Sequence, residues 1–217
     1  MKLQEFRNIP FTPQMLDAVY PANSDLQSKA ERLTKSGNII RLRRGLYVVS
    51  PSDTGVPLSS FLIANHIYGP SYVSMESALR FYGLIPETVH ETISVCCKAT
   101  KVFENQLGKF RYIHAALPYY SIGITTQSEE NVRFLIATPE KAICDLISYT
   151  PKLNLRSKRE VLEYLTEYLR IDLDDVLQLD PTRLESIAKY AKKSHIIYTI
   201  IKLIQNGRNV SADVVKI

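Results

Sequence analysis

A helix that ends at a glycine and leads directly into two short apolar runs is the feature that most restricts how this sequence can fold. Residues 24–36 carry apolar side chains at helical spacing, and Gly37 follows the last turn. Residues 39–42 and 46–49 are typical of short strands, and Arg43-Arg44-Gly45 between them is typical of a turn. The sequence therefore predicts a helix followed by a β-hairpin within the first fifty residues.

A further helix is predicted just upstream. Thr12 can cap it and Pro13 suits its first position, where the missing N–H is harmless, and it stops before Pro21. Ser24 then caps the next helix, and Gln27 three residues later completes a capping box. Helix, turn, helix and hairpin in this order are the layout of a winged helix-turn-helix domain.

The outer face of the second helix is polar and mostly cationic. In a winged helix-turn-helix this helix enters the major groove and contacts base edges, while cations on the hairpin contact phosphates. The predicted DNA-binding residues are Ser28, Lys29, Arg32 and Lys35 on the helix and Arg41, Arg43 and Arg44 on the hairpin. In the alternative interpretation, these cations form an ordinary solvated surface that prevents strand aggregation.

The positive charge of the chain is concentrated in the same segment. The net charge is +5, and residues 1–50 hold eight Lys or Arg against four Asp or Glu, a net of +4. Residues 51–217 hold nineteen against eighteen. This distribution favours an N-terminal contact with a polyanion, although it is also compatible with solubility alone.

The remaining chain predicts a larger α+β domain. The connector at residues 53–57 is rich in turn residues and separates a domain of residues 1–52 from one of residues 56–217. The expected elements are helices at 58–68 and 74–83, strands at 92–97, 110–115, 121–126 and 132–136, and four helices between 156 and 205. We expect a small sheet of four or five strands, packed by helices and followed by a helical C-terminal part.

Thr138 and Pro139 open one more helix, which has a distinct polar set. An apolar stripe occupies one face, so Glu140, Lys141 and Asp145 are expected outside, with Lys141 and Asp145 one turn apart. Such a pair is commonly an ordinary ion pair on a helix surface. It is also a possible surface for a protein partner.

No pattern points clearly to catalysis. The four histidines have no zinc-site spacing, no phosphate-binding glycine loop is present, and Cys96, Cys97 and Cys144 form no metal pair, so we expect no catalytic site, no metal and no cofactor. A metal-dependent nuclease using Glu76, Glu91, Lys141 and Asp145 is the least favoured alternative. No run of 18 apolar residues and no secretory signal is seen, so we expect a cytoplasmic protein without membrane contact.

Three stretches together resemble the AbiEi family, the antitoxins of type IV abortive-infection toxin–antitoxin systems. They are RLTKSGNIIRLRRGLYVV at residues 32–49, YVSMESALRFYGLIPE at residues 72–87 and TPEKAICDLI at residues 138–147. The resemblance implies a DNA-binding domain that represses its own operon through promoter repeats. It also implies a second domain that counteracts a nucleotidyltransferase-like toxin encoded nearby. A winged-helix regulator without a toxin partner is the alternative.

Overall fold

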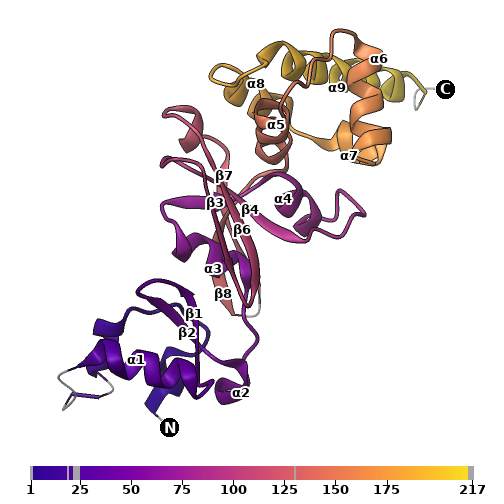
Figure 1. Ribbon diagram of the computed structural model, residues 1–217. Coiled ribbons are helices and arrows are strands. Elements are labelled where there is room, and N and C mark those ends of the chain that lie inside the picture. Colours follow the sequence, from indigo (N-terminus) through magenta and orange to yellow (C-terminus); the bar gives the residue numbers. More distant parts are fainter. Residues whose placement is uncertain (1, 19, 22–24, 130, 215–217) are drawn as a thin grey trace.

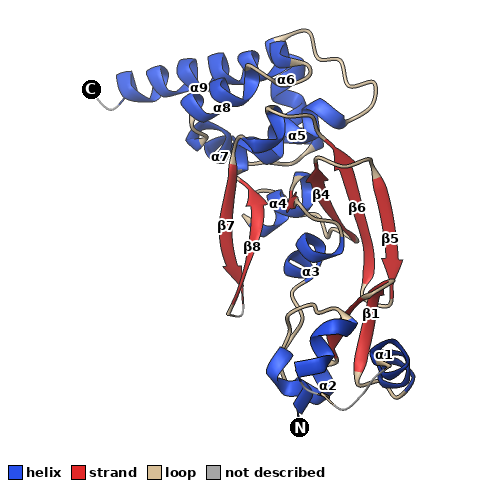
Figure 2. Ribbon diagram, turned by 90° about the vertical axis from the view of Figure 1, so that its left-hand side faces the viewer, coloured by secondary structure: helices blue, strands red, loops and turns tan. Residues whose placement is uncertain are grey.

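The computed structural model describes residues 2–18, 20–21, 25–129 and 131–214. The chain forms an N-terminal module, a central six-stranded sheet with helices against it, and a helical C-terminal part at the opposite end of the sheet (Figure 1). This is the α+β class expected from a run of strands flanked by helices. Figure 2 shows the same three parts from the side.

The N-terminal module contains two 3₁₀ helices, two α-helices and a hairpin. The elements are η1 (Lys2–Phe6), η2 (Pro13–Ala18), α1 (Leu26–Lys35), β1 (Ile39–Arg43), β2 (Leu46–Val49) and α2 (Pro51–Thr54). The helix expected after Thr12 is therefore a 3₁₀ helix rather than an α-helix. Gly37 follows α1 in the left-handed conformation, at φ 78°, as a helix-ending glycine should.

The cap of α1 differs from the one expected. Asp25 is the N-cap, and its side chain accepts a hydrogen bond from the Ser28 backbone N–H at 3.0 Å. The predicted cap, Ser24, lies outside the described residues. Its expected partner Gln27 instead donates to Glu31 and to the Tyr47 hydroxyl. Both residues can cap a helix start, so the sequence alone did not distinguish them.

The hairpin β1–β2 is buried on both of its faces. Ile39, Tyr47 and Val49 belong to a small N-terminal core together with residues of η1, η2 and α1. On the other face Ile40, Leu42, Leu46 and Val48 belong to the main core of the larger domain. Alternate residues of a strand point to opposite faces, so the two cores share this hairpin.

The central sheet has six strands in the order β5-β6-β4-β3-β8-β7, one more than the largest number expected. The strands are β3 (Ser71–Val73), β4 (Glu91–Cys96), β5 (Lys101–Asn105), β6 (Gly108–His114), β7 (Ile124–Glu129) and β8 (Val132–Ala137). β3 pairs in parallel with β8, and β4 pairs in parallel with β6; the other pairs are antiparallel. β3 and β5 were not anticipated.

Helices pack against this sheet and then form the C-terminal part. The helices near the sheet are α3 (Ser60–Ile67), α4 (Met75–Phe81), η3 (Tyr119–Ser121) and α5 (Pro139–Tyr149). The C-terminal elements are α6 (Lys158–Glu163), the π-helical turn η4 (Tyr164–Tyr168), α7 (Leu173–Gln178), α8 (Pro181–Ala188) and α9 (Ser194–Val214). No described helix combines the length and the apolar character needed to cross a membrane.

Candidate nucleic-acid interface

Helix α1 presents its polar residues on the side opposite the N-terminal core. Ala30 and Leu33 are buried in that core, whereas Ser28, Arg32 and Lys35 are exposed. This is the arrangement that the 3.6-residue period predicts. Hydrogen bonds from Ser28 lower the pKa of the Asp25 carboxyl, so the cap is charged at neutral pH.

The hairpin continues this polar face through Arg41. Arg41 is exposed on the strand face shared with Tyr47, and it lines a pocket of about 260 Å³ together with Lys35 and Glu31 of α1. Helix and hairpin cations therefore meet on one side of the module. Glu31 lines the same pocket and adds a negative charge to it.

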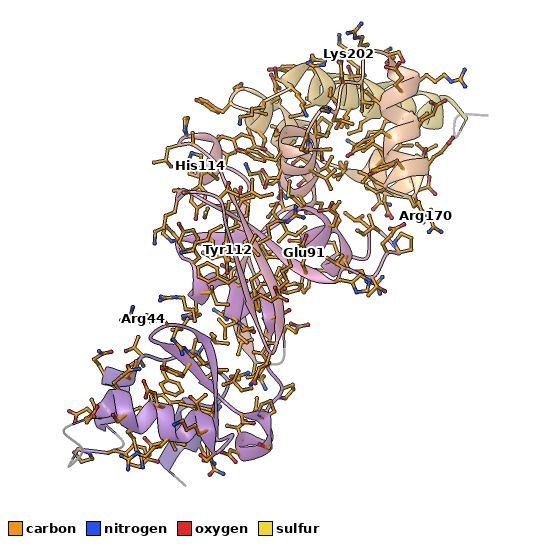
Figure 3. The ribbon with its side chains drawn as sticks, in the orientation of Figure 1. Arg44, Glu91, Tyr112, His114, Arg170 and Lys202 are labelled. Carbon is orange, nitrogen blue, oxygen red and sulfur yellow. The ribbon has the colours of Figure 1, made fainter. Side chains whose placement is uncertain are left out.

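Arg44 is at the tip of the hairpin and Arg43 is one residue before it. Arg44 is exposed and lies at the edge of the module that faces the larger domain (Figure 3). Arg43 behaves differently, because its Nε donates to the Ile67 carbonyl oxygen at 2.8 Å and its Nη1 to the Arg44 carbonyl oxygen at 3.0 Å. Arg43 therefore links the hairpin to the end of α3, a contact that the sequence did not predict.

The predicted cations form no close ion pairs within the described part of the chain. Among the described residues, no ion pair within 4.0 Å involves Lys29, Arg32, Lys35, Arg41, Arg43 or Arg44. Lys29 instead places its Nζ over the Tyr20 ring, 4.4 Å from the centroid. The positive charge of this face is thus available to an external anion.

The expected partner surface on α5 is wrong. Glu140 is 5% exposed, and Lys141 and Asp145 are 0% exposed. Helix α5 contacts β8, α4, α8 and α9, so its polar side is covered as well as its apolar stripe. Glu140 accepts a hydrogen bond from the backbone N–H of Asp180, the cap of α8. A helical wheel cannot show that further helices will cover the polar side.

Lys141 and Asp145 form a buried ion pair, with 3.2 Å between Nζ and Oδ1. Lys141 Nζ also donates to the Tyr119 carbonyl oxygen at 2.9 Å. Asp145 Oδ2 accepts from the Tyr72 hydroxyl at 3.1 Å and from the Ser74 hydroxyl at 2.6 Å. Burial lowers the pKa of the Lys141 ammonium, and the neighbouring Asp145 carboxylate opposes that shift. All members of this cluster are buried, and it joins β3, η3 and α5.

The residues of the nuclease alternative are divided between two places. Glu76 and Glu91 line a cavity of about 490 Å³, where Glu91 is held by Lys109 at 3.2 Å and Arg111 at 2.5 Å. Lys141 and Asp145 are paired with each other in the buried cluster. Among the described residues, no three His, Cys, Asp or Glu side chains gather closely enough to hold a metal ion.

The fold resembles that of a solved protein structure. It is the crystal structure of the RV2827C protein from Mycobacterium tuberculosis, with a TM-score of 0.57 and 11% sequence identity over 91% of this chain and 74% of that chain. At this identity the likeness establishes the fold alone. No family model and no curated protein sequence matches the chain.

Sequence reasoning missed a second group of cations, on the larger domain. Lys98 and Lys101 lie beside Arg43 in a pocket of about 470 Å³. The only signal was the polar turn at residues 98–100 after an apolar strand, and without β5 there was no reason to place it near the hairpin.

Proposed function

We propose that this protein is a DNA-binding antitoxin that represses its own operon. Its N-terminal module acts as a winged helix-turn-helix, in which α1 enters the major groove at operator repeats and the β1–β2 hairpin is the wing. The larger domain counteracts a nucleotidyltransferase-like toxin encoded nearby, as the AbiEi resemblance implies.

The observation that carries the DNA-binding part is the set of unpaired cations on one side of the module. Arg32, Lys35 and Arg41 are exposed there, and none of them forms an ion pair within 4.0 Å with a described carboxylate. Positive side chains left without internal partners repel one another, and a DNA backbone with one charge per roughly 1.7 Å would relieve that repulsion. An α-helix also fits the B-DNA major groove.

Two kinds of contact are expected. Ser28, Arg32 and Lys35 are exposed on α1, and in the proposed complex they contact base edges, which specify sequence. Arg41 and Arg44 are exposed on the hairpin, and in the same complex they contact phosphates, which position the protein without specifying sequence. Arg43, which donates to the Ile67 carbonyl oxygen, fixes the wing against the end of α3. A module of this size binds modestly, so two copies on repeated sites are expected.

Binding of the full-length protein to a fluorescent duplex of its own promoter tests this proposal. Arg44→Ala should weaken binding to all duplexes alike and reduce the slope of log K against log salt by about 0.9. Arg32→Ala should relax preference at one base pair, at a cost of about 1–3 kcal/mol. Lys202→Ala is the matched control, because Lys202 is exposed on α9 at the end of the molecule opposite Arg44 (Figure 3).

Two outcomes would contradict DNA binding. The first is wild-type protein that shows no salt-dependent affinity for any duplex. The second is Arg32→Ala and Arg44→Ala variants that behave like Lys202→Ala although the wild type binds.

The toxin partner is tested separately. If the neighbouring open reading frame encodes a nucleotidyltransferase-like protein, co-expression with this chain should restore growth that the neighbour alone arrests. A gene with no such neighbour favours the alternative of a regulator without a toxin. Glu140, Lys141 and Asp145 are not candidates for the toxin contact, because all three are buried.

A further inference from the structure

A second cationic pocket lies where the hairpin meets the larger domain. Its volume is about 470 Å³, and none of its lining residues is an Asp or Glu. The side chains that give it its character are Arg43, His66, Tyr68, Lys98, Lys101 and Phe103. They come from the hairpin, from the end of α3, from the turn before β5 and from β5 itself.

The lysines of this pocket are held by neutral groups only. Lys98 Nζ donates to the Gly69 carbonyl oxygen at 2.5 Å and lies 5.2 Å from the centroid of the Tyr68 ring. Lys101 Nζ lies 5.0 Å from the centroid of the Phe103 ring. The last carbonyl groups of α3 carry partial negative charge, which attracts the cations and accounts for some of this arrangement. The positive charges themselves stay unneutralised, since no described carboxylate lies within 4.0 Å of Arg43, Lys98 or Lys101.

Glu104, the acidic residue of β5, points away from the pocket. Along β5, Lys101 and Phe103 share one face, and Glu104 belongs to the opposite face because strand residues alternate. Lys98 and Lys101 are both exposed. Three full positive charges therefore face solvent in one pocket.

We propose that this pocket binds phosphates of the same duplex that α1 and the wing contact, so that the DNA interface extends onto the larger domain. The inference rests on the proposed function. Arg43 joins the two parts, because it donates to the carbonyl oxygen of the wing-tip residue Arg44 and lines the pocket with Lys98 and Lys101. In the proposed complex, a DNA strand whose phosphates contact the wing tip would contact Lys98 and Lys101 with its next phosphates.

Duplex DNA suits the pocket better than a single strand. Single-stranded nucleic acid is bound chiefly by stacking bases on exposed aromatic faces. Here the ammonium groups of Lys98 and Lys101 lie over the Tyr68 ring, and Lys101 also lies over Phe103. The Tyr68 and Phe103 rings of the pocket thus each have an ammonium group over them, so the pocket offers charge more than a stacking surface.

The test compares full-length wild-type protein with a Lys98→Ala/Lys101→Ala variant on a fluorescent promoter duplex at several salt concentrations. The variant should lose about two phosphate contacts, which lowers the slope of log K against log salt by about 1.8. The affinity ratio between promoter and unrelated duplex should stay unchanged, because phosphate contacts carry no sequence information. A Lys98→Arg/Lys101→Arg variant should retain the wild-type slope, and Lys202→Ala should too.

The outcomes separate this inference from the proposed function. Wild-type protein that binds no duplex overturns both. Wild-type protein that binds, with an unchanged slope in the Lys98→Ala/Lys101→Ala variant, overturns only the extended interface. A preference for single-stranded DNA that the alanine variant loses also overturns it, because the pocket would then serve a different ligand. Equal thermal unfolding of the alanine and arginine variants shows that folding is not the cause.

Discussion

At the scale of single residues, the main departure from expectation is the buried polar cluster around α5. Lys141 and Asp145 were correctly expected to pair at i, i+4, and they do so without exposure to water. Tyr72, Ser74 and Tyr119 supply the remaining hydrogen bonds of the pair. Ions taken out of water are costly unless paired and hydrogen-bonded, so each partner depends on the other.

Removing one partner of this pair should be strongly destabilising. Lys141→Met leaves Asp145 charged and buried, and we expect it to lower the free energy of unfolding by about 3–5 kcal/mol. A Lys141→Met/Asp145→Leu variant removes both charges and should be less destabilised than the single variant. Urea denaturation of the full chain measures both changes. A single variant as stable as the wild type would mean that the pair contributes nothing.

The exposed polar face of α1 was predictable for a reason that did not hold on α5. Ser28, Arg32 and Lys35 lie on a helix with a core on one side only, so helical spacing alone predicts their exposure. Helix α5 is covered by elements that follow it by more than thirty residues, α8 and α9. Local periodicity carries no information about such distant packing.

At the scale of elements, caps and turns were predictable where the chemistry is local. Thr138 accepts a hydrogen bond from the Lys141 backbone N–H and opens α5 as expected. Ser157 and Glu160 form a complete capping box for α6. Strand β3 escaped prediction because it is three residues long, and β5 because its alternation is weak. Both are recognisable as strands only through their neighbours in the sheet.

Gly123 is an element-scale constraint on α5. It precedes β7 at φ 75°, its carbonyl oxygen accepts from the Thr138 N–H at 2.8 Å, and an added Cβ would lie 2.8 Å from Lys141 Cβ. Gly83, after α4, has a similar φ of 72° but open space around the added atom. The two glycines thus separate the cost of backbone conformation from the cost of crowding.

Gly123→Ala should therefore destabilise the protein more than Gly83→Ala does. Both alanines carry the left-handed penalty of about 1–2 kcal/mol, and crowding should add about 1–3 kcal/mol at position 123. Thermal unfolding of the two variants side by side measures the difference. Equal losses would indicate that α5 shifts freely away from the β7 turn.

At the scale of the whole molecule, buried tyrosines couple stability to alkaline pH. Burial raises the pKa of Tyr72 and Tyr119 well above the usual value of a tyrosine. Burial also raises the pKa of Tyr120 to about 12 and that of Tyr164 to about 12. These four residues come from β3, η3 and η4, so any effect on them involves the central sheet and the C-terminal part together.

The protein should lose stability above about pH 10. In the unfolded chain tyrosines ionise near pH 10, whereas the folded chain keeps these four protonated. The stabilisation is fully present below pH 10 and is lost as the pH rises toward the folded pKa values. Absorbance at 295 nm and far-UV circular dichroism, followed together, should show late tyrosine ionisation that coincides with loss of structure. Ionisation of all 13 tyrosines in one early step, with the dichroism intact, would contradict this.

The three-part layout was predictable from composition and periodicity, but the way the parts join was not. The turn residues at positions 53–57 predicted the boundary between the N-terminal module and the larger domain. Nothing in the sequence showed that Leu42 and Val48 pack into the main core while Tyr47 packs into the N-terminal one. A strand with apolar residues on both faces indicates that two surfaces cover it, without identifying them.

This shared hairpin limits how the molecule can be taken apart or recombined. A fragment that stops at residue 52 would leave Ile40, Leu42, Leu46 and Val48 bare, which are one whole side of the hairpin. Joining the N-terminal module to an unrelated protein at residues 53–57 would carry that exposed apolar side with it. A transferable unit would also have to include the parts of α3 and β5 that cover the hairpin. Exchange of this module between related proteins should therefore follow the limits of that packing and not the connector at residues 53–57.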